Sequence, residues 1–408
     1  MSRSLTLDLE SARRLAVSCQ HLAGPRPGND LDGLRRVLRT LRCLQLDPVN
    51  VVARSHLLVL WSRVGGYDPA DVDVLLWRER RLFEYWAHAA SIVLAEDYPI
   101  HQVTMRAYPA GDSGYARQVR DWMTANDALR QHILDRLREK GPLPVGRFED
   151  LAAVAWRSSG WTNGRNVERM LDFLWFQGQV MVAGREGRTR LWDLTEHRLP
   201  EWARTAPLPR EEAVTRAAEH ALRALGVARA ADIERHFIRD RYPGLAEVLS
   251  GLEASGRVVP AEVEGGDERW YVHRDVLGLL ERDWVPRTTL LSPFDNLICD
   301  RERTQRLWGF TFRTEMYVPK ARHAGGRGDR RRPGGRRAGR VRRGPRDRLR
   351  GQGPGPVAGR SGLLTRSPSP SPSPMLSRPV CGYSSTHQQR PGCQPGPSHR
   401  SRAWRRSR

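Results

Sequence analysis

The first 80 residues carry apolar positions at the spacing of amphipathic helices. Residues 8–20 place apolar side chains three and four apart, which predicts a helix with one buried face. The same spacing predicts a second helix at about 31–43, after the turn-forming GPRPGND, and a third over 55–63, before a Gly-Gly pair. In DPADVDVLLWRERR, Asp68 caps a fourth predicted helix and proline takes its first position.

Two later stretches repeat one order of elements. Residues 167–196 and 245–275 each predict a helix, a strand, a glycine-containing turn and a second strand. Short helical patterns precede them, at about 130–155 and 210–240. Helices followed by a two-stranded wing are typical of the winged-helix form of the helix-turn-helix. The repeat therefore predicts a mainly α protein with small β wings, built from tandem winged-helix domains rather than from one large core.

Positive charge is concentrated at the carboxyl end of the chain. Residues 321–408 contain 22 arginines, no lysine and two aspartates, which accounts for +20 of the formal net charge of +22. The overall basicity therefore belongs to this tail and is not evidence about the rest of the chain. Its Arg, Gly, Pro and Ser composition cannot bury enough apolar surface to offset the entropy of ordering, so we expect the tail to be disordered.

The sequence RCLQLDPVNVV places an amide and a carboxylate two residues apart, directly before a proline. Pro48 disfavours helical geometry at Asp47 and pushes it towards an extended conformation. In an extended segment, residues two apart point the same way. We therefore expect Leu46 to turn into the core while Gln45 and Asp47 face a cleft.

Several longer blocks resemble one known family. LRTLRCLQLDPVNVVARSHLLVLWSRVGGYDP, RLFEYWAHAAS, SGWTNGRNVERMLDFLWFQGQVMVAGREG, TRLWDLTE and LLSPFDNLICDRERTQRLWGFTFRTEMYVP occur here in the order of the YcaQ/AlkZ family of winged-helix DNA glycosylases. The resemblance covers roughly residues 5–320 and implies three tandem winged-helix domains, a C-terminal β-barrel and removal of bulky N7-alkylated purines, including those in interstrand crosslinks. Gln45-Leu46-Asp47 is similar to the family's Gln-Φ-Asp motif, in which Φ is apolar.

The resemblance and the repeat together give predicted domain boundaries. These are winged-helix domains at 1–128, 129–205 and 206–283, the start of a truncated β-barrel at 284–320 and the disordered basic tail at 321–408. The chain departs from the family pattern after Pro319, where strands would complete the barrel. An abrupt change to Arg, Gly, Pro and Ser is typical of an out-of-frame reading of a GC-rich gene, so we hypothesise a frameshift there.

The chemistry implied by the resemblance needs few groups. An N7-alkylguanine is already cationic, so its base leaves without protonation, and the acid of the usual two-carboxylate glycosidase pair is dispensable. One carboxylate is needed near the sugar carbon that becomes positively charged. Asp47 is the predicted carboxylate, as electrostatic stabiliser or general base, and Gln45 the predicted partner for water or sugar. No lysine is required, which predicts a hydrolytic, monofunctional enzyme without lyase activity. For Asp47 the structural alternative is a turn or cap residue before proline.

Three further residues are candidates for lining the site. Glu84 and His88 lie four apart in FEYWAHAAS, so they share a face if the segment is helical and separate if it is extended. Their alternative role is a buried polar pair among aromatic side chains. His56 either faces the same cleft or is a solvated helix residue. These residues lack the spacing of a known metal site, so no metal and no cofactor are predicted.

The predicted DNA contacts are arginines and small polar residues of the second domain. Those at the start of its recognition helix offer hydrogen-bond donors to phosphates, and those in its wing form a second basic group. Each can equally be a solvated side chain. The residues are Arg157, Ser159, Thr162, Asn163, Arg165 and Arg169, with Arg185, Arg188 and Arg190 in the wing.

The predicted partner is double-stranded DNA carrying alkylated purines, and we expect a monomer. The five cysteines form no CxxC pair, no apolar run reaches the ~20 residues of a membrane span, and the N-terminus lacks a signal-peptide pattern. These observations predict a cytoplasmic protein that makes no membrane contact and joins the nucleoid when bound to DNA. The alternatives are a non-catalytic winged-helix regulator, and an inactive truncated glycosylase.

Overall fold

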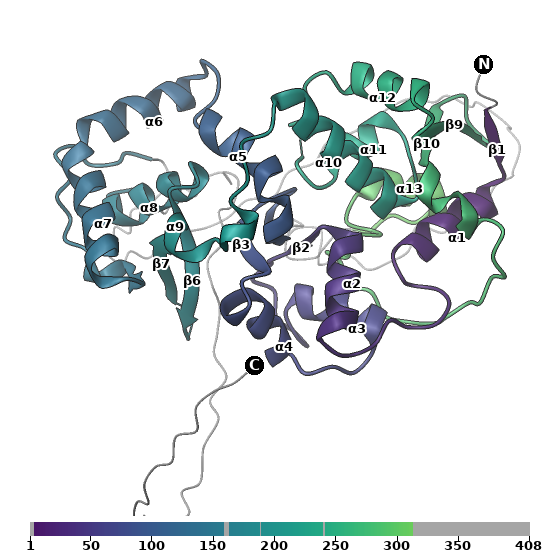
Figure 1. The fold of residues 1–408 in the computed structure, drawn as a ribbon, viewed down its shortest axis with the longest axis horizontal. Helices are drawn as coiled ribbons and strands as arrows, with labels where there is room; N and C mark the ends of the chain where they lie inside the picture. The colour runs from purple at the N-terminus through teal and green to yellow at the C-terminus, as the bar shows by residue number, and fades with distance from the viewer. Residues whose placement is uncertain (1–3, 159–162, 188, 240, 313–408) are drawn as a thin grey trace, which may run out of the picture.

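Three units, each with helices and a small sheet, follow one another along the chain. The structure, a computed structural model, describes residues 4–158, 163–187, 189–239 and 241–312. Figure 1 shows the second unit at one end of the molecule, the third at the other end and the first between them. Among the described residues, no helix has both the length and the apolar character needed to cross a membrane.

The first unit extends from α2 to β4. It contains α2 (Leu31–Leu41), β2 (Cys43–Gln45), α3 (Ser55–Val64), α4 (Ala70–Asp73), the π-helical turn η1 (Val74–Arg78), β3 (Leu82–Trp86) and β4 (Ala90–Leu94). The helix predicted at about 31–43 is confirmed as α2. Asp30 caps this helix by accepting a hydrogen bond from the amide of Gly33. The fourth predicted helix is also present, and the Asp68 carboxylate accepts from the amide of Ala70 at 2.9 Å.

The second and third units have the order of elements that the repeat predicts. The second comprises α7 (Asp127–Lys140), β5 (Leu143–Pro144), α8 (Asn166–Phe176), β6 (Val180–Glu186), β7 (Thr189–Leu194) and α9 (Thr195–Arg198). The third comprises α10 (Arg210–Leu225), β8 (Val227–Ala228), α11 (Ala230–Arg235), α12 (Leu245–Ala254), β9 (Val258–Val263), β10 (Arg269–His273) and the 3₁₀ helix η5 (Arg274–Leu279). Helices α5 (Tyr98–Ala107) and α6 (Gly114–Ala125) connect the first unit to the second.

Each unit has its own sheet, and the third sheet gains a strand from the amino terminus. The first two sheets have the orders β2-β4-β3 and β5-β7-β6, with antiparallel neighbours. In the third, β1 (Leu5–Leu7) pairs parallel to β9, with Leu5 opposite Ala261. Helix α1 (Leu9–Cys19), which confirms the helix predicted at 8–20, also packs with the third unit. The sequence did not predict this long-range pairing.

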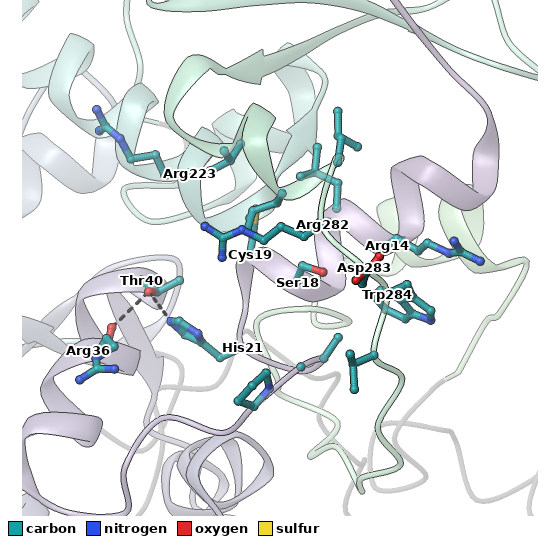
Figure 2. Close-up of a pocket in the computed structure, with 18 of the residues that line it drawn as sticks. Arg14, Ser18, Cys19, His21, Arg36, Thr40, Arg223, Arg282, Asp283 and Trp284 are labelled. Atoms are coloured by element: carbon teal, nitrogen blue, oxygen red, sulfur yellow. Dashed lines mark hydrogen bonds between the residues drawn. The ribbon is translucent and has the colours of Figure 1, made fainter.

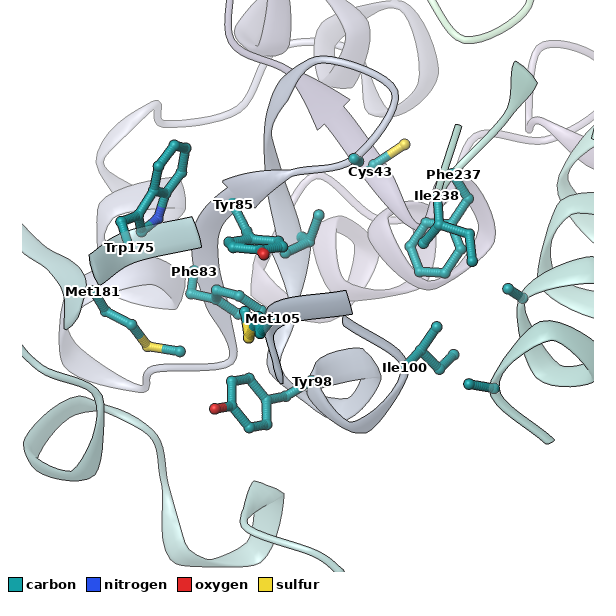
Figure 3. Packing of buried hydrophobic residues seen from close by; sticks show 14 of the residues in the cluster. Cys43, Phe83, Tyr85, Tyr98, Ile100, Met105, Trp175, Met181, Phe237 and Ile238 are labelled. Atoms are coloured by element: carbon teal, nitrogen blue, oxygen red, sulfur yellow. The ribbon is translucent and has the colours of Figure 1, made fainter. Parts of the chain in front are cut away.

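Aromatic packing joins the first unit to the second and third. In the cluster of Figure 3, the ring of Phe83 lies 5.9 Å from that of Tyr98, and the ring of Tyr85 lies 5.6 Å from that of Trp175, both edge-on. Phe237 of the third unit belongs to the same buried cluster. Edge-on aromatic contacts fix orientation as well as bury area. The sheet that carries the Gln-Leu-Asp motif therefore shares one buried cluster with the second and third units.

Residues 284–312 differ from the expected barrel. In this described range the structure has no strand, and its regular element is the helix α13 (Arg301–Trp308). A single barrel strand formed by residues 284–312 would leave its backbone N–H and C=O groups unpaired, because no neighbouring barrel strand is described in this range. The segment packs instead against the first unit, where Asp295 forms a buried two-point ion pair with Arg63 at 2.6 and 2.9 Å. The tail after residue 312 lies outside the described residues.

Candidate functional site

The Gln-Leu-Asp motif lies where β2 ends and the chain turns towards α3. The amide of Leu46 donates to the carbonyl of Ala90 on β4 at 2.7 Å, which continues the sheet pairing by one residue. The side chain of Leu46 packs against the core of the first unit. Alternation along the strand then places Gln45 on the opposite face, as the sequence predicts.

Asp47 is half-buried at this turn. Its Oδ1 accepts from the amide of Val49 at 2.9 Å, and its carboxylate also accepts from the side chain of Gln45. Burial raises the pKa of Asp47, while these two hydrogen bonds act to lower it. The carboxylate thus combines the turn-forming role of an aspartate before proline with a contact to the neighbouring amide.

A chain of hydrogen bonds fixes the amide of Gln45. His88 Nε2 lies 3.2 Å from Gln45 Oε1, and His88 Nδ1 lies 3.4 Å from the sulfur of Cys43. Burial lowers the pKa of His88 to about 4 and raises that of Cys43, so the imidazole is neutral and the thiol keeps its proton. The thiol then donates to Nδ1, Nε2–H donates to Gln45 Oε1, and the NH₂ of Gln45 is left for Asp47. Cys43, two residues before Gln45 on one strand face, could have been found from alternation alone.

Backbone contacts from two other segments hold β2 in place. Ser55, the first residue of α3, donates from Oγ to the carbonyl of Gln45 at 2.8 Å. Asn296 donates from Nδ2 to the carbonyl of Cys43 at 2.9 Å. The site therefore depends on residues that are far apart in sequence.

Glu84 and His88 do not form the pair that a helix would give. The segment is strand β3 and the turn after it, and Glu84 is bound by Arg185 of β6 through contacts of 2.7, 2.8 and 3.0 Å. Arg190 lies 3.6 Å from the same carboxylate. Glu84 is 3% exposed, so it is a structural carboxylate between the first two units. His88 alone of the two contacts Gln45.

His56 is buried rather than solvated, which excludes one of its two predicted roles. It is 7% exposed, and burial, with smaller contributions from Arg54 and Arg185, lowers its pKa to about 3. Its Nδ1 has no hydrogen-bond partner among the described residues. His56 is thus a buried, neutral imidazole in the first turn of α3.

The predicted DNA-contact residues divide into exposed and engaged groups. Arg157 is exposed, and Arg165 is exposed with Glu168 at 3.7 Å. Arg169 is 5% exposed and lies 3.3 Å from Asp172. Arg185 and Arg190 bind Glu84, and Asn163 accepts from the amide of Ser158 at 3.2 Å. Ser159, Thr162 and Arg188 lie outside the described residues.

A separate hollow of about 820 Å³ lies between α1, α2 and the segment after β10 (Figure 2). In it, the Nε2 of His21 lies 2.9 Å from the hydroxyl of Thr40. Seven arginines line the hollow, and five of them pair with carboxylates: Arg14, Arg35, Arg39, Arg42 and Arg223. Its charge is therefore largely compensated, and no residue of the Gln-Leu-Asp motif contributes to its lining.

A second hollow, of about 640 Å³, has an aromatic lining and lies on the same sheet face as Gln45. Its lining includes Tyr85, Tyr108, Phe176 and Tyr242. In the sheet register Tyr85 faces Ser91, which in turn faces Gln45. Two strand spacings of ~4.8 Å put the backbones of Tyr85 and Gln45 roughly 10 Å apart. Among the described residues, no three His, Cys, Asp or Glu side chains gather in a metal-binding arrangement.

Comparisons with known proteins agree with this architecture. A family model described as DNA glycosylase AlkZ-like matches residues 38–354, which is more than half of the chain. The matched range includes the Gln-Leu-Asp motif. It also extends past Pro319, so the match does not mark the point at which the chain departs from the family pattern, and that point stays a prediction. The structure is similar in fold to the DNA glycosylase AlkZ of Streptomyces sahachiroi, with a TM-score of 0.52 and 16% identity. That match covers 72% of this chain and 77% of the AlkZ chain.

Proposed function

Because this chain belongs to the AlkZ-like DNA glycosylase family, we propose that it hydrolyses the N-glycosidic bond of bulky N7-alkylated purines in duplex DNA, with Asp47 as the catalytic carboxylate. Purines joined in interstrand crosslinks carry the same cationic leaving base, so they fall in the proposed substrate class. The winged-helix form of the three units is part of this proposal.

The observation that carries the proposal is the carboxylate of Asp47 beside the oriented amide of Gln45. A half-buried anion that accepts two hydrogen bonds from the described residues keeps the capacity to stabilise a nearby positive charge. At about 4 Å from a unit charge and an effective dielectric of about 20, that interaction amounts to about 4 kcal/mol. A stabilisation of this size corresponds to roughly a thousandfold in rate.

Hydrolysis, rather than a lyase reaction, fits the side chains present. A lyase needs an amine nucleophile, and the chain contains two lysines, Lys140 and Lys320. Lys140 is exposed in the last turn of α7, in the second unit. We therefore assign a water molecule as the nucleophile, activated or positioned by Asp47 and Gln45.

The aromatic hollow supports the choice of bulky substituents. Its lining of Tyr85, Tyr108, Phe176 and Tyr242 offers faces for an apolar group on the purine, at a distance that a large substituent can span. Arg157 and Arg165 are exposed on the second unit and are the proposed phosphate contacts.

The test is base release from a duplex that contains one N7-methylguanine. The wild-type protein should produce alkali-labile abasic sites, and Asp47→Asn should reduce their rate of formation by roughly a thousandfold with little change in DNA affinity. Because asparagine preserves the size and the hydrogen-bond acceptor at the turn, a general loss of folding is not expected. Binding without release by the wild type would favour the non-catalytic regulator, and turnover by Asp47→Asn at the wild-type rate would remove Asp47 from the mechanism.

A further inference from the structure

Two adjacent valines stand out from the surface next to the candidate site. Val51 is 89% exposed and Val52 is 86% exposed, higher fractions than those of the other exposed large apolar residues described. Single exposed apolar residues are ordinary on a protein surface. Two in succession, in the same loop as Asp47, suggest a function that compensates for their exposure.

The loop that carries them is pinned at both ends. It spans residues 46–54 between β2 and α3, and the bond from Ser55 Oγ to the carbonyl of Gln45 closes it at its base. At its start, Pro48 restricts the backbone, and the bond from the Val49 amide to Asp47 forms a local turn. The valines therefore protrude from a closed, locally stiffened loop.

We propose that Val51 and Val52 form an apolar wedge that enters the base stack of bound DNA beside the lesion. Val51 lies four positions after Asp47, so their Cα atoms lie no more than roughly 14 Å apart. That distance corresponds to about four base steps at 3.4 Å each. Partial unstacking beside the lesion would let Asp47 approach the sugar of a bulky or crosslinked purine without complete extrusion of the base.

The charge next to the wedge favours DNA over a protein as its occupant. Arg54 follows the valines in the same loop, and among the described residues no carboxylate pairs with it. An apolar tip with an adjacent unpaired cation suits a duplex, whose stacked bases are flanked by phosphates. A second protein chain would need a complementary apolar surface around the site that the DNA must enter.

This inference rests on the proposed function, and a stacking measurement separates the two. A duplex would carry 2-aminopurine one to four base steps from an N7-alkylguanine, and its fluorescence would be followed as full-length protein is added. We expect wild type to raise the fluorescence through unstacking and Val51→Ser/Val52→Ser to abolish that rise. The double variant should also lose about tenfold or more in DNA affinity, as expected when the burial of two valine side chains is lost.

The matched control is Leu290→Ser, which changes another apolar side chain, 78% exposed, outside the loop. It should behave as wild type in fluorescence, affinity and base release. The wedge is refuted if the double variant raises the fluorescence as wild type does, or if wild type releases the base with no rise at any probe position. A rise with wild type and no base release would support the wedge and contradict the proposed glycosylase.

Discussion

Replacing His88 should slow base release without weakening DNA binding. His88→Leu keeps an apolar volume but removes the Nε2–H that donates to Gln45 Oε1 at 3.2 Å. The Gln45 amide is then free to rotate, so the bond to Asp47 is lost together with the one from His88. The two lost contacts are the neutral hydrogen bond from His88 and the bond from Gln45 to the charged carboxylate of Asp47. Together they contribute about 2 kcal/mol, a figure reduced because Gln45 is partly exposed to solvent. That loss corresponds to about thirtyfold in the rate of the chemical step.

Single-turnover base release at saturating protein measures this step apart from binding. His88→Gln is the conservative variant, because its amide can donate from nearly the same position as Nε2, and it should restore most of the rate. DNA affinity should stay within about twofold for both variants, since His88 is partly buried and does not contact DNA in the proposed complex. An unchanged rate in His88→Leu, or equal losses in both variants, would show that the orientation of Gln45 does not limit the reaction.

Three other predictions follow from the described contacts. Since burial raises the pKa of Asp47 and the reaction needs its anion, the acid limb of a pH–rate profile should lie above the ordinary aspartate range, and it should vanish with Asp47→Asn. The free energy of unfolding depends on pH in the opposite direction from the rate. Because the pKa of Asp47 is raised in the folded state, ionisation of Asp47 lowers stability as the pH rises, so Asp47→Asn should melt no lower than wild type at neutral pH. Arg63→Met should lower the melting temperature by about 10 °C, because it leaves the carboxylate of Asp295 buried and unpaired, whereas Arg63→Met/Asp295→Leu should recover most of that loss. A profile that is the same for both proteins, or a double variant as unstable as the single one, would contradict these arguments.

Local patterns predicted the helices well because caps and apolar spacing act over a few residues. Helices α1 and α2 begin at or within one residue of the starts predicted at residues 8 and 31, and the repeated order of helix and strands is present in the second and third units. The pairing of β1 with β9 could not be predicted, because it joins segments more than 250 residues apart through a three-residue strand. Barrel strands also depend on distant partners, and over residues 284–312, the described part of the expected barrel, the chain forms coil and α13 instead.

The candidate site shows the same division between local and long-range information. The orientation of Leu46 followed from Pro48 and strand alternation, both local properties. The partners of Glu84 did not, since an acid in an aromatic segment gives no indication that arginines of another unit will bind it. His88 contacts Gln45 only because β3 and β4 are joined by a turn that brings it over β2. Pairing of this kind depends on the sheet register, which sequence spacing does not supply.

Within the described residues, the groups that hold the candidate carboxylate lie well before the basic tail. Gln45 is oriented through His88, the strand that carries it is bound by Asn296, and the helix after it is fixed by the pair of Arg63 and Asp295. These contacts belong to residues 43–296, whereas the departure from the family pattern is predicted after Pro319. A change confined to the tail therefore alters none of the residues that make these described contacts. For this reason the geometry favours an active glycosylase over an inactive truncated one.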